Sequence, residues 1–373
     1  MTTNIAVIGL GTMGLGIAQT YAAAGFTVLA TDAIQAARDS AFERLRVGLA
    51  PRVEAGKMAQ SDLDALMARI SVVSGPEAMG GADLAIEAVV EKIEIKRDLF
   101  AALESVVAPD TVLATNTSSL SVAAMAEGLV RPERLLGLHF FNPAPVMKLV
   151  ELVAHSATDP EALEKARRLT EAAGKTVIQC LDRPGFIVNR CARPFYGEAL
   201  ALLEEGRSAS DIDAAMLAAG YRLGPFGLID LVGADINLAA TESLAAAMGN
   251  HPRYNVFAAL RDQVRAGHLG RKTGTGFVFP DKPGPAPSDA AEIALRIEAT
   301  LANEACWLLA EGGTTRNGID AAMKLGLNFP RGPFEIITMH GRERVLEKLQ
   351  QLAALAPAHL KDRYLPAPAL AQS

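Results

Sequence analysis

The feature that most limits the fold of this chain is a glycine-rich turn near its start, followed by an acidic residue at a set distance. Gly9, Gly11 and Gly14 follow the β-branched run NIAVIG and open a helical pattern, and Asp32 ends the next predicted strand. Such glycines allow a tight turn and let a pyrophosphate approach a helix N-terminus, where free N–H groups favour anions. The pattern predicts a βαβ unit that binds a dinucleotide.

The turn also indicates which dinucleotide is bound. The residues expected at the cofactor phosphates are Gly9, Gly11, Thr12, Met13 and Gly14. Asp32 is placed to accept hydrogen bonds from the adenosine ribose hydroxyls, and its carboxylate would repel a 2′-phosphate. The next residue is Ala33 rather than an arginine, and Arg38 lies about one helical turn further on. The sequence therefore favours NAD over NADP.

The first half of the chain alternates between strand and helix patterns. The strand candidates are NIAVIG, FTVLATD, ISVVS, DLAIEAVV, TVLATNT, LLGLHFF, KLVELVA and KTVIQC, from Asn4 to Cys180. Strands separated by helix-length segments predict a mostly parallel sheet with helices on both faces. We expect an α/β, Rossmann-type domain over residues 1–183.

The second half is predicted to be helical and internally repeated. Pro and Gly punctuate the chain at 182–186, and a Pro-rich stretch at 281–289 is typical of an exposed linker. Gly-Pro-Phe recurs at an offset of 108 (332 − 224) and Asp-Ala-Ala-Met at 107 (320 − 213), which indicates duplication of a helical module. We expect two tandem all-α domains, at 184–280 and 290–373.

Composition excludes several classes of partner. The net charge is −6, and the basic residues are dispersed, so no nucleic-acid-binding surface is predicted. The three cysteines are too far apart for a CxxC pair, which argues against a disulfide framework and a metal site. No apolar run is long enough to span a membrane, and no leader precedes the first strand. These features predict a cytoplasmic protein.

Polar residues follow several predicted strands, at the edge where ligands bind in open α/β sheets. They are Glu91, Asn116, Ser118, Ser119 and His139. Removal of a hydride from an alcohol needs a base for the hydroxyl proton, and histidine is the side chain suited to neutral pH. His139 is therefore the candidate base.

Glu151 lies twelve positions after His139 in a nearly apolar run. A buried carboxylate needs a hydrogen-bonding partner. If that partner is the imidazole of His139, Glu151 sets the ring tautomer and stabilises the protonated ring. The alternative is equally simple: a histidine among aromatics is often a satisfied core residue, and a strand glutamate often faces solvent.

A series of motifs resembles the L-3-hydroxyacyl-CoA dehydrogenase family. The motifs are GLGTMGLGIAQ, VVEKIEIK, TNTSSL, GLHFFNPAPVMKLVEL, PGFIVNR, GPF and GRKTGTGF, in the order and spacing of the family up to about residue 280. The resemblance implies helical domains like the C-terminal domain of 6-phosphogluconate dehydrogenase. It also implies NAD-dependent oxidation of an (S)-3-hydroxyacyl-CoA, such as 3-hydroxybutyryl-CoA, to a 3-ketoacyl-CoA in fatty-acid or aromatic-acid catabolism.

The resemblance assigns roles to individual residues. His139 matches the general base and Glu151 its carboxylate partner, while Ser118 and Asn189 match groups that hydrogen-bond the reacting part of the substrate. The residues that match the nicotinamide end of the cofactor site are Glu91, Lys96 and Asn116. Lys57 resembles a lysine that meets the coenzyme A phosphates.

Other interpretations stay open at this point. A related dehydrogenase of a free acid, of the gulonate or carnitine type, would share the fold and the histidine–glutamate pair. A non-catalytic NAD-binding protein would keep only the cofactor turn. The second helical copy carries Leu295 near the position of Asn189 in the first, so no second active site is expected. It is expected to form either a pseudo-dimer within one chain or part of a homodimer.

Overall fold

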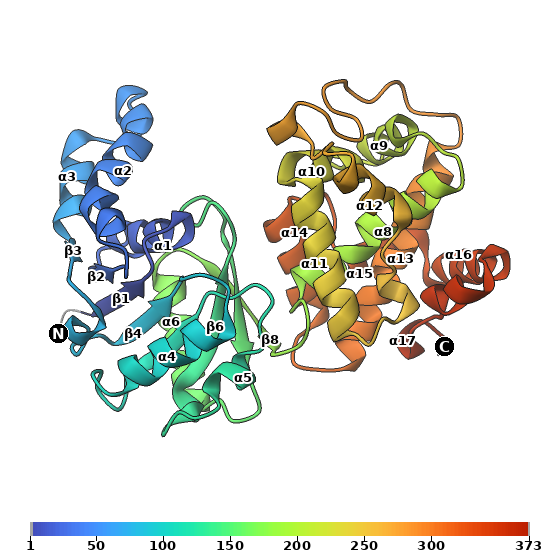
Figure 1. Cartoon of the computed structure of the whole chain (residues 1–373). Helices are drawn as coiled ribbons and strands as arrows, with labels where there is room; N and C mark the ends of the chain where they lie inside the picture. The colour runs from blue at the N-terminus through green and yellow to red at the C-terminus, as the bar shows by residue number, and fades with distance from the viewer. Residues whose placement is uncertain (1–2, 372–373) are drawn as a thin grey trace. The chain divides into compact units, whose positions relative to one another are not determined.

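The computed structural model describes residues 3–371, and the chain divides into two compact units, Met1–Arg183 and Pro184–Ser373. The first unit is an α/β sheet domain, and the second is helical (Figure 1). This confirms the predicted fold class. The further division of the helical half at residues 281–289 stays a prediction.

The described residues of the first unit contain one eight-stranded sheet in the order β3-β2-β1-β4-β5-β6-β7-β8. The strands are β1 (Asn4–Ile8), β2 (Thr27–Thr31), β3 (Ile70–Val72), β4 (Leu84–Glu87), β5 (Val112–Thr115), β6 (Leu135–Phe140), β7 (Leu149–Ala154) and β8 (Thr176–Leu181). All neighbours are parallel except β6 and β7. Each strand falls within one of the predicted runs or extends it by one residue.

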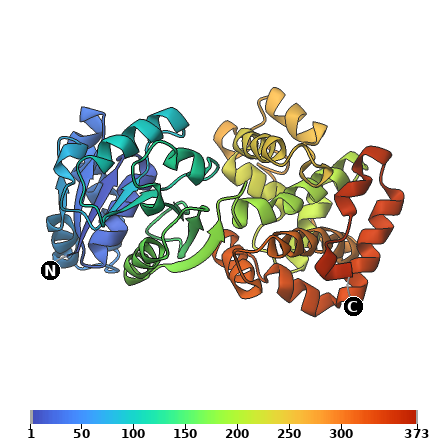
Figure 2. The same cartoon turned by 90° about the horizontal axis from the view of Figure 1, so that it is seen from below.

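Helices connect these strands and cover the sheet (Figures 1 and 2). They are α1 (Thr12–Ala23), α2 (Gln35–Glu54), α3 (Gln60–Ala68), α4 (Ile93–Glu104), α5 (Val122–Ala126) and α6 (Pro160–Ala172), with 3-10 turns η1 (Pro76–Ala78) and η2 (Pro132–Arg134). β2 and β3 follow on one side of β1, whereas β4 to β6 follow on the other. Right-handed crossovers therefore place α1 and α4 on opposite faces. Because both faces are covered, the central strands are apolar nearly throughout.

The loop between β6 and β7 is held by a buried lysine. Lys175, just before β8, donates hydrogen bonds from Nζ to the carbonyl oxygens of Ala144, at 2.5 Å, and Met147, at 2.9 Å. Burial lowers the pKa of Lys175. This contact fixes the path by which the chain leaves β6 and returns in β7.

The helical unit is built around one long helix, α13 (Ala290–Ala310), which contacts helices from both halves of the unit (Figure 2). The other helices are α7 (Val188–Cys191), α8 (Arg193–Glu204), α9 (Ala209–Ala218), α10 (Pro225–Val232), α11 (Ala234–Ala247), α12 (Ala258–Arg265), α14 (Arg316–Leu327), α15 (Pro333–His340), α16 (Arg342–Leu355) and α17 (Pro368–Ala371). The 3-10 turns are η3 (Pro252–Tyr254), η4 (Arg271–Thr273) and η5 (Ala358–Tyr364). Pro194 lies in the first turn of α8, where its missing N–H breaks no hydrogen bond of the helix.

The sequence repeat returns as a repeat of contacts. In the first half, the Asp213 carboxylate accepts hydrogen bonds from the backbone N–H groups of Phe226 and Gly227. In the second half, Asp320 accepts one from Phe334 at 2.8 Å. Burial raises the pKa of Asp213 to about 7 and also raises that of Asp320. Equivalent aspartates thus cap the N-termini of equivalent helices, α10 and α15, in the two halves.

Two buried glutamates at equivalent positions, Glu198 on α8 and Glu304 on α13, connect the halves. Each accepts hydrogen bonds from two arginines and a tyrosine of the other half. The donors to Glu198 are Arg296 Nε at 2.7 Å, Arg363 Nε at 3.0 Å and Tyr364 OH at 3.0 Å. The donors to Glu304 are Arg190 Nε at 2.7 Å, Arg253 Nε at 3.0 Å and Tyr254 OH at 2.5 Å. Such reciprocal contacts are typical of a two-fold interface.

Candidate functional site

The glycine-rich turn between β1 and α1 forms a cradle in which two of the three glycines leave no room for a side chain. Gly9 has φ +99°, and an added Cβ there would lie 2.5 Å from the Ala88 carbonyl oxygen. A Cβ on Gly14 would lie 1.7 Å from the Gly9 carbonyl oxygen, whereas one on Gly11 would meet nothing within 4 Å. The fold therefore excludes a side chain at Gly9 and Gly14, whereas the space beside Gly11 is open to a ligand, as a pyrophosphate site requires.

The start of α1 is suited to an anion. The backbone of Gly11 begins the helix, and among the described residues no side chain caps it. Thr12 is exposed and Met13 half-buried at this end. The uncapped N–H groups and the helix dipole are the donors that a cofactor phosphate needs. The residues present therefore fit a dinucleotide.

Asp32 stands between this turn and the end of β2. Its Oδ2 accepts a hydrogen bond from the Leu10 N–H at 2.6 Å, and its Oδ1 accepts one from the Ile34 N–H at 2.8 Å. An ionised carboxylate has about four acceptor positions, so two backbone bonds leave capacity for ribose hydroxyls. Arg38 donates to the backbone carbonyl of Asp32 rather than to its carboxylate.

At the carboxyl ends of β4 and β5, a buried lysine joins two glutamates. Lys96 on α4 places Nζ 2.8 Å from Glu87 Oε1 and 3.0 Å from Glu91 Oε2. Glu87 is fully buried and also accepts hydrogen bonds from the Val89 N–H and the Thr115 hydroxyl. Sequence reasoning named Glu91 and Lys96 but missed Glu87. The sequence signal that could have identified Glu87 is a glutamate inside a predicted strand whose neighbouring residues are apolar.

Glu91 in turn organises the loop after β5. Its Oε1 accepts hydrogen bonds from the Thr117 hydroxyl, the Ser118 N–H at 3.2 Å and the Ser119 hydroxyl at 3.2 Å. Partial burial raises the pKa of Glu91, but Lys96 and the Thr117 and Ser118 donors outweigh this effect, so its pKa lies below the ordinary value. The ionised glutamate thus holds Ser118 at the carboxyl edge of the sheet.

Asn116 links this loop to the next strand. Its Oδ1 accepts a hydrogen bond from the Phe140 N–H at 2.9 Å. Phe140 directly follows His139, so the amide fixes the end of β6 beside the loop that carries Ser118. The helix α5 begins after Ser121, whose hydroxyl accepts from the Ala124 N–H, so Ser121 rather than Ser118 is its N-cap.

His139 and Glu151 are directly opposite each other in the antiparallel β6–β7 pair. His139 Nδ1 lies 2.6 Å from Glu151 Oε2, and Glu151 is fully buried. A carboxylate can only accept in this bond, so Nδ1 carries the proton in the neutral ring. The Phe141 ring, with its centroid 4.5 Å from that of His139, packs against the imidazole. The contact with Glu151 thus fixes the ring tautomer and leaves Nε2 as the acceptor nitrogen.

Two predicted site residues belong to other elements of the chain. Asn189 belongs to α7 in the helical unit, and Lys57 lies exposed between α2 and α3. Lys57 lines a groove of about 750 Å³ together with four other basic residues, Arg52, Arg69, Lys148 and Lys175. Within the sheet domain the structure therefore brings Ser118, Asn116, Glu91 and Lys96 into one hydrogen-bonded edge, with His139 and Glu151 beside it.

The lysine–glutamate cluster leads to a testable prediction. Lys96→Met removes the cation between Glu87 and Glu91, so the pKa of Glu91 should rise. Because Glu91 holds the Ser118 loop only when ionised, its contribution is present above its pKa and lost as the pH falls through it. We expect the acid limb of the kcat/KM profile to move to higher pH.

The matched control for that experiment is Lys92→Met, four residues earlier and exposed. It removes a surface charge of the same kind at the start of the same helix. Its pH profile should superpose on that of the unmodified protein. Equal shifts in both variants would contradict a specific role for Lys96.

Within residues 3–371, no cluster of histidine, cysteine, aspartate and glutamate is arranged to hold a metal ion. In the same range, no helix has both the length and the apolar character needed to cross a bilayer.

Family models match almost the whole chain. The model described as "3-hydroxyacyl-CoA dehydrogenase, NAD binding domain" matches residues 4–183. The model described as "3-hydroxyacyl-CoA dehydrogenase, C-terminal domain" matches residues 185–279 and 293–372.

Similar proteins carry related names. A 3-hydroxyadipyl-CoA dehydrogenase of Escherichia coli K12 is 44% identical over 275 residues, which cover 73% of this chain and 58% of that protein. A probable 3-hydroxybutyryl-CoA dehydrogenase of Bacillus subtilis is 39% identical over 276 residues, covering 74% of this chain and 96% of that protein. The match thus spans little more than half of the E. coli protein.

A solved structure resembles the chain over its full length. The crystal structure of 3-hydroxybutyryl-CoA dehydrogenase from E. coli K12 superposes with a TM-score of 0.92 at 33% sequence identity. The superposition covers 100% of this chain and 98% of that chain.

Proposed function

Since this chain belongs to the 3-hydroxyacyl-CoA dehydrogenase family, an NAD-dependent oxidoreductase family, we propose that it oxidises an (S)-3-hydroxyacyl-CoA to the 3-ketoacyl-CoA with His139 as the general base. The observation that carries the proposal is the 2.6 Å contact between His139 Nδ1 and the buried Glu151 carboxylate at the carboxyl edge of the sheet. NAD, when bound in the glycine cradle, supplies the acceptor for the hydride from C3.

In the proposed mechanism, His139 and Glu151 remove the proton from the substrate hydroxyl group. Glu151 accepts a hydrogen bond from the Nδ1–H group, so His139 takes the substrate hydroxyl proton on Nε2. The ring then becomes an imidazolium, and the adjacent carboxylate stabilises its positive charge in a buried setting where the interaction is little screened by solvent. A positioned base of this kind contributes about 10²–10⁴-fold to rate.

Ser118 and Asn189 are proposed to hydrogen-bond the reacting oxygen of the substrate, as their family motifs imply. The ionised Glu91 supports this role by holding the Ser118 N–H. Lys96 is proposed to act indirectly, because its ammonium is buried between two carboxylates. Asn116 is proposed to align the end of β6 with the cofactor site.

The coenzyme A phosphates are proposed to meet the groove that Lys57 lines. Its basic residues create a positive potential that attracts phosphates. Pro145, Val146 and Lys148 of the β6–β7 loop also line the groove, so the loop that follows His139 connects the proposed base to the proposed phosphate site.

The repeated helical unit is proposed to act as a pseudo-dimer within one chain. The reciprocal contacts of Glu198 and Glu304 support this proposal, since equivalent residues of each half contact the other half in the same way. The second half would then cover the surface of the first that a single-copy relative would use to bind another subunit.

A panel of substrates tests the proposed reaction. NADH formation would be followed with 3-hydroxybutyryl-CoA, longer 3-hydroxyacyl-CoA thioesters, 3-hydroxyadipyl-CoA and the corresponding free acids. The names of the relatives make the C4 and the dicarboxylic thioesters the first to compare. We expect turnover with the thioesters and not with the free acids, since the coenzyme A part supplies binding energy far from the reacting carbon. Faster turnover of a free hydroxyacid would refute the proposal.

A further inference from the structure

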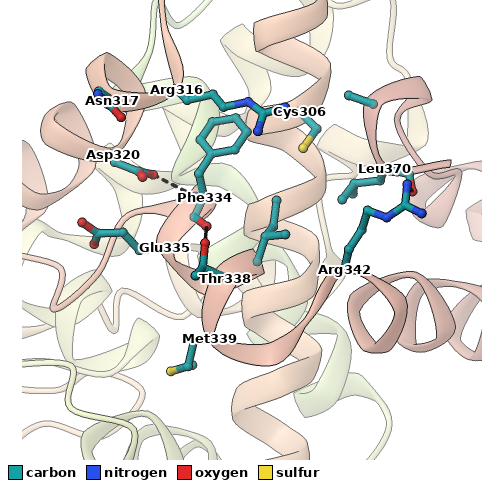
Figure 3. Close-up of a pocket in the computed structure, with 12 residues that line it drawn as sticks. Cys306, Arg316, Asn317, Asp320, Phe334, Glu335, Thr338, Met339, Arg342 and Leu370 are labelled. Carbon is teal, nitrogen blue, oxygen red and sulfur yellow. Dashed lines mark hydrogen bonds between the residues drawn. The ribbon is translucent and has the colours of Figure 1, made fainter. Parts of the chain in front are cut away.

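A pocket of about 560 Å³ lies in the second half of the helical unit, and none of the residues proposed for the catalytic site lines it (Figure 3). Its walls come from α13, α14, α15, the start of α16 and α17. The lining residues that bear on its chemistry are Arg316, Asp320, Phe334, Thr338, Arg342 and Leu370. A volume of this size is that of a small-molecule site.

The equivalent place in the first half is filled by the chain itself. Asp230, the counterpart of Thr338, accepts hydrogen bonds at 2.8 Å from the backbone N–H groups of Phe277, Val278 and Phe279. The Phe277 ring packs on Phe226, with centroids 4.8 Å apart, and Phe226 is fully buried. The first half therefore uses this position to hold the turn formed by residues 276–281 of its own chain.

In the second half, the residues at the equivalent position differ in polarity and charge. Phe334 replaces Phe226 at an offset of 108 (334 − 226), but it is only half-buried. Within the described residues no aromatic ring stacks on Phe334, and the Arg316 guanidinium lies 5.4 Å from its centroid instead. Arg316 replaces Ala209, and Thr338 replaces Asp230. An acceptor of backbone N–H groups has been lost, and a cation has been gained.

The carboxylates near the pocket are already engaged. Asp320 accepts the Phe334 N–H, and Glu335 pairs with Lys324 and accepts the Gly332 N–H. Among the described residues no carboxylate lies within ion-pair distance of Arg316. Figure 3 shows its guanidinium above the Phe334 ring, with Leu370 and Arg342 on a separate wall of the pocket. The pocket thus offers a ring face, apolar walls and two arginines, of which Arg316 lies over the ring.

We propose that this pocket binds a small ligand that joins a flat apolar ring to a carboxylate or phosphate. The ring takes the place that Phe277 occupies in the first half, and the anion pairs with Arg316. This inference does not depend on the proposed dehydrogenase function.

Binding to the full chain tests the proposal with three probes that share one ring. Phenylacetate and phenyl phosphate carry the two candidate anions, and phenylacetamide is the neutral analogue. Dissociation constants would be measured by ligand-observed NMR in the presence of saturating NADH. We expect at least one anion to bind about tenfold more tightly than phenylacetamide, about 1.4 kcal/mol. The anion that binds identifies the natural class as carboxylate or phosphate.

Three variants locate the site. Arg316→Gln removes the cation, and Thr338→Asp restores the carboxylate found in the first half, so each should weaken binding of the anion about tenfold. Both positions are exposed, so the fold should persist, as the thermal midpoint will show. Arg344→Gln removes an exposed arginine of α16 that does not line the pocket and should leave binding unchanged. Equal affinity for the anions and phenylacetamide, or wild-type affinity in Arg316→Gln, would overturn the proposal.

Discussion

His139→Gln should lower turnover by about 10²–10⁴-fold while NAD binding is retained. Glutamine keeps the size of the side chain and a hydrogen bond toward Glu151, but it cannot take a proton from the substrate. The cradle for NAD lies on β1, α1 and β2, so its residues are untouched. The measurement is steady-state NADH formation, with NADH binding followed separately by fluorescence.

A second histidine–glutamate pair supplies the control. His340 Nε2 lies 2.6 Å from Glu298 Oε2 in the helical unit, the same separation as in the proposed catalytic pair. His340→Gln makes the same chemical change, and turnover should stay near that of the unmodified protein. If both variants lost turnover equally, the loss would reflect a structural effect of breaking a histidine–glutamate pair and not a role of His139 as base. Unchanged turnover in His139→Gln would remove His139 from the role of base.

Glu304→Gln should lower the free energy of unfolding of the helical unit by about 3 kcal/mol. Arg190 is fully buried, and the substitution removes one of its ionised partners, leaving Glu311. Removal of one partner from a buried ion pair is costly because the remaining charge stays out of water. Urea unfolding followed by the fluorescence of Trp307 measures the change, since Trp307 lies on α13 and is the only tryptophan of the chain.

The control is Glu292→Gln at the start of the same helix. Glu292 is exposed and pairs with Lys348 and Arg344 on the surface. Solvent-exposed ion pairs contribute about 1 kcal/mol or less, so this variant should unfold close to the unmodified protein. Equal destabilisation by the two substitutions would contradict a special contribution of the buried network.

The order of elements was predictable because it depends on short-range patterns. The β-branched runs and their spacing predicted all eight strands, and the parallel sheet follows from helix-length connections between them. The glycine turn and Asp32 were recognisable for the same reason. A tight turn, a helix start and an acidic residue about 20 positions on are all local features.

The partners of buried charges were not predictable in the same way. The sequence placed His139 and Glu151 on two successive strand candidates, and only the family resemblance assigned them as a pair; their contact needs the antiparallel register that sets residue 139 opposite residue 151. Glu87 was missed altogether, because its partner Lys96 is on a helix and its burial depends on neighbouring strands. Glu198 and Glu304 lie at equivalent positions of the repeat, but the sequence does not indicate that each contacts the other half.

By itself, then, the sequence determined the succession of strands and helices, the dinucleotide cradle and the family. These depend on periodicity, turn residues and spacing within segments of a few dozen residues. The tertiary structure decided which carboxylate faces which cation, and it left the position of Phe334 open where that of Phe226 is filled. The reason is physical: pairing and burial depend on distances between residues far apart in the chain, and only packing sets those distances.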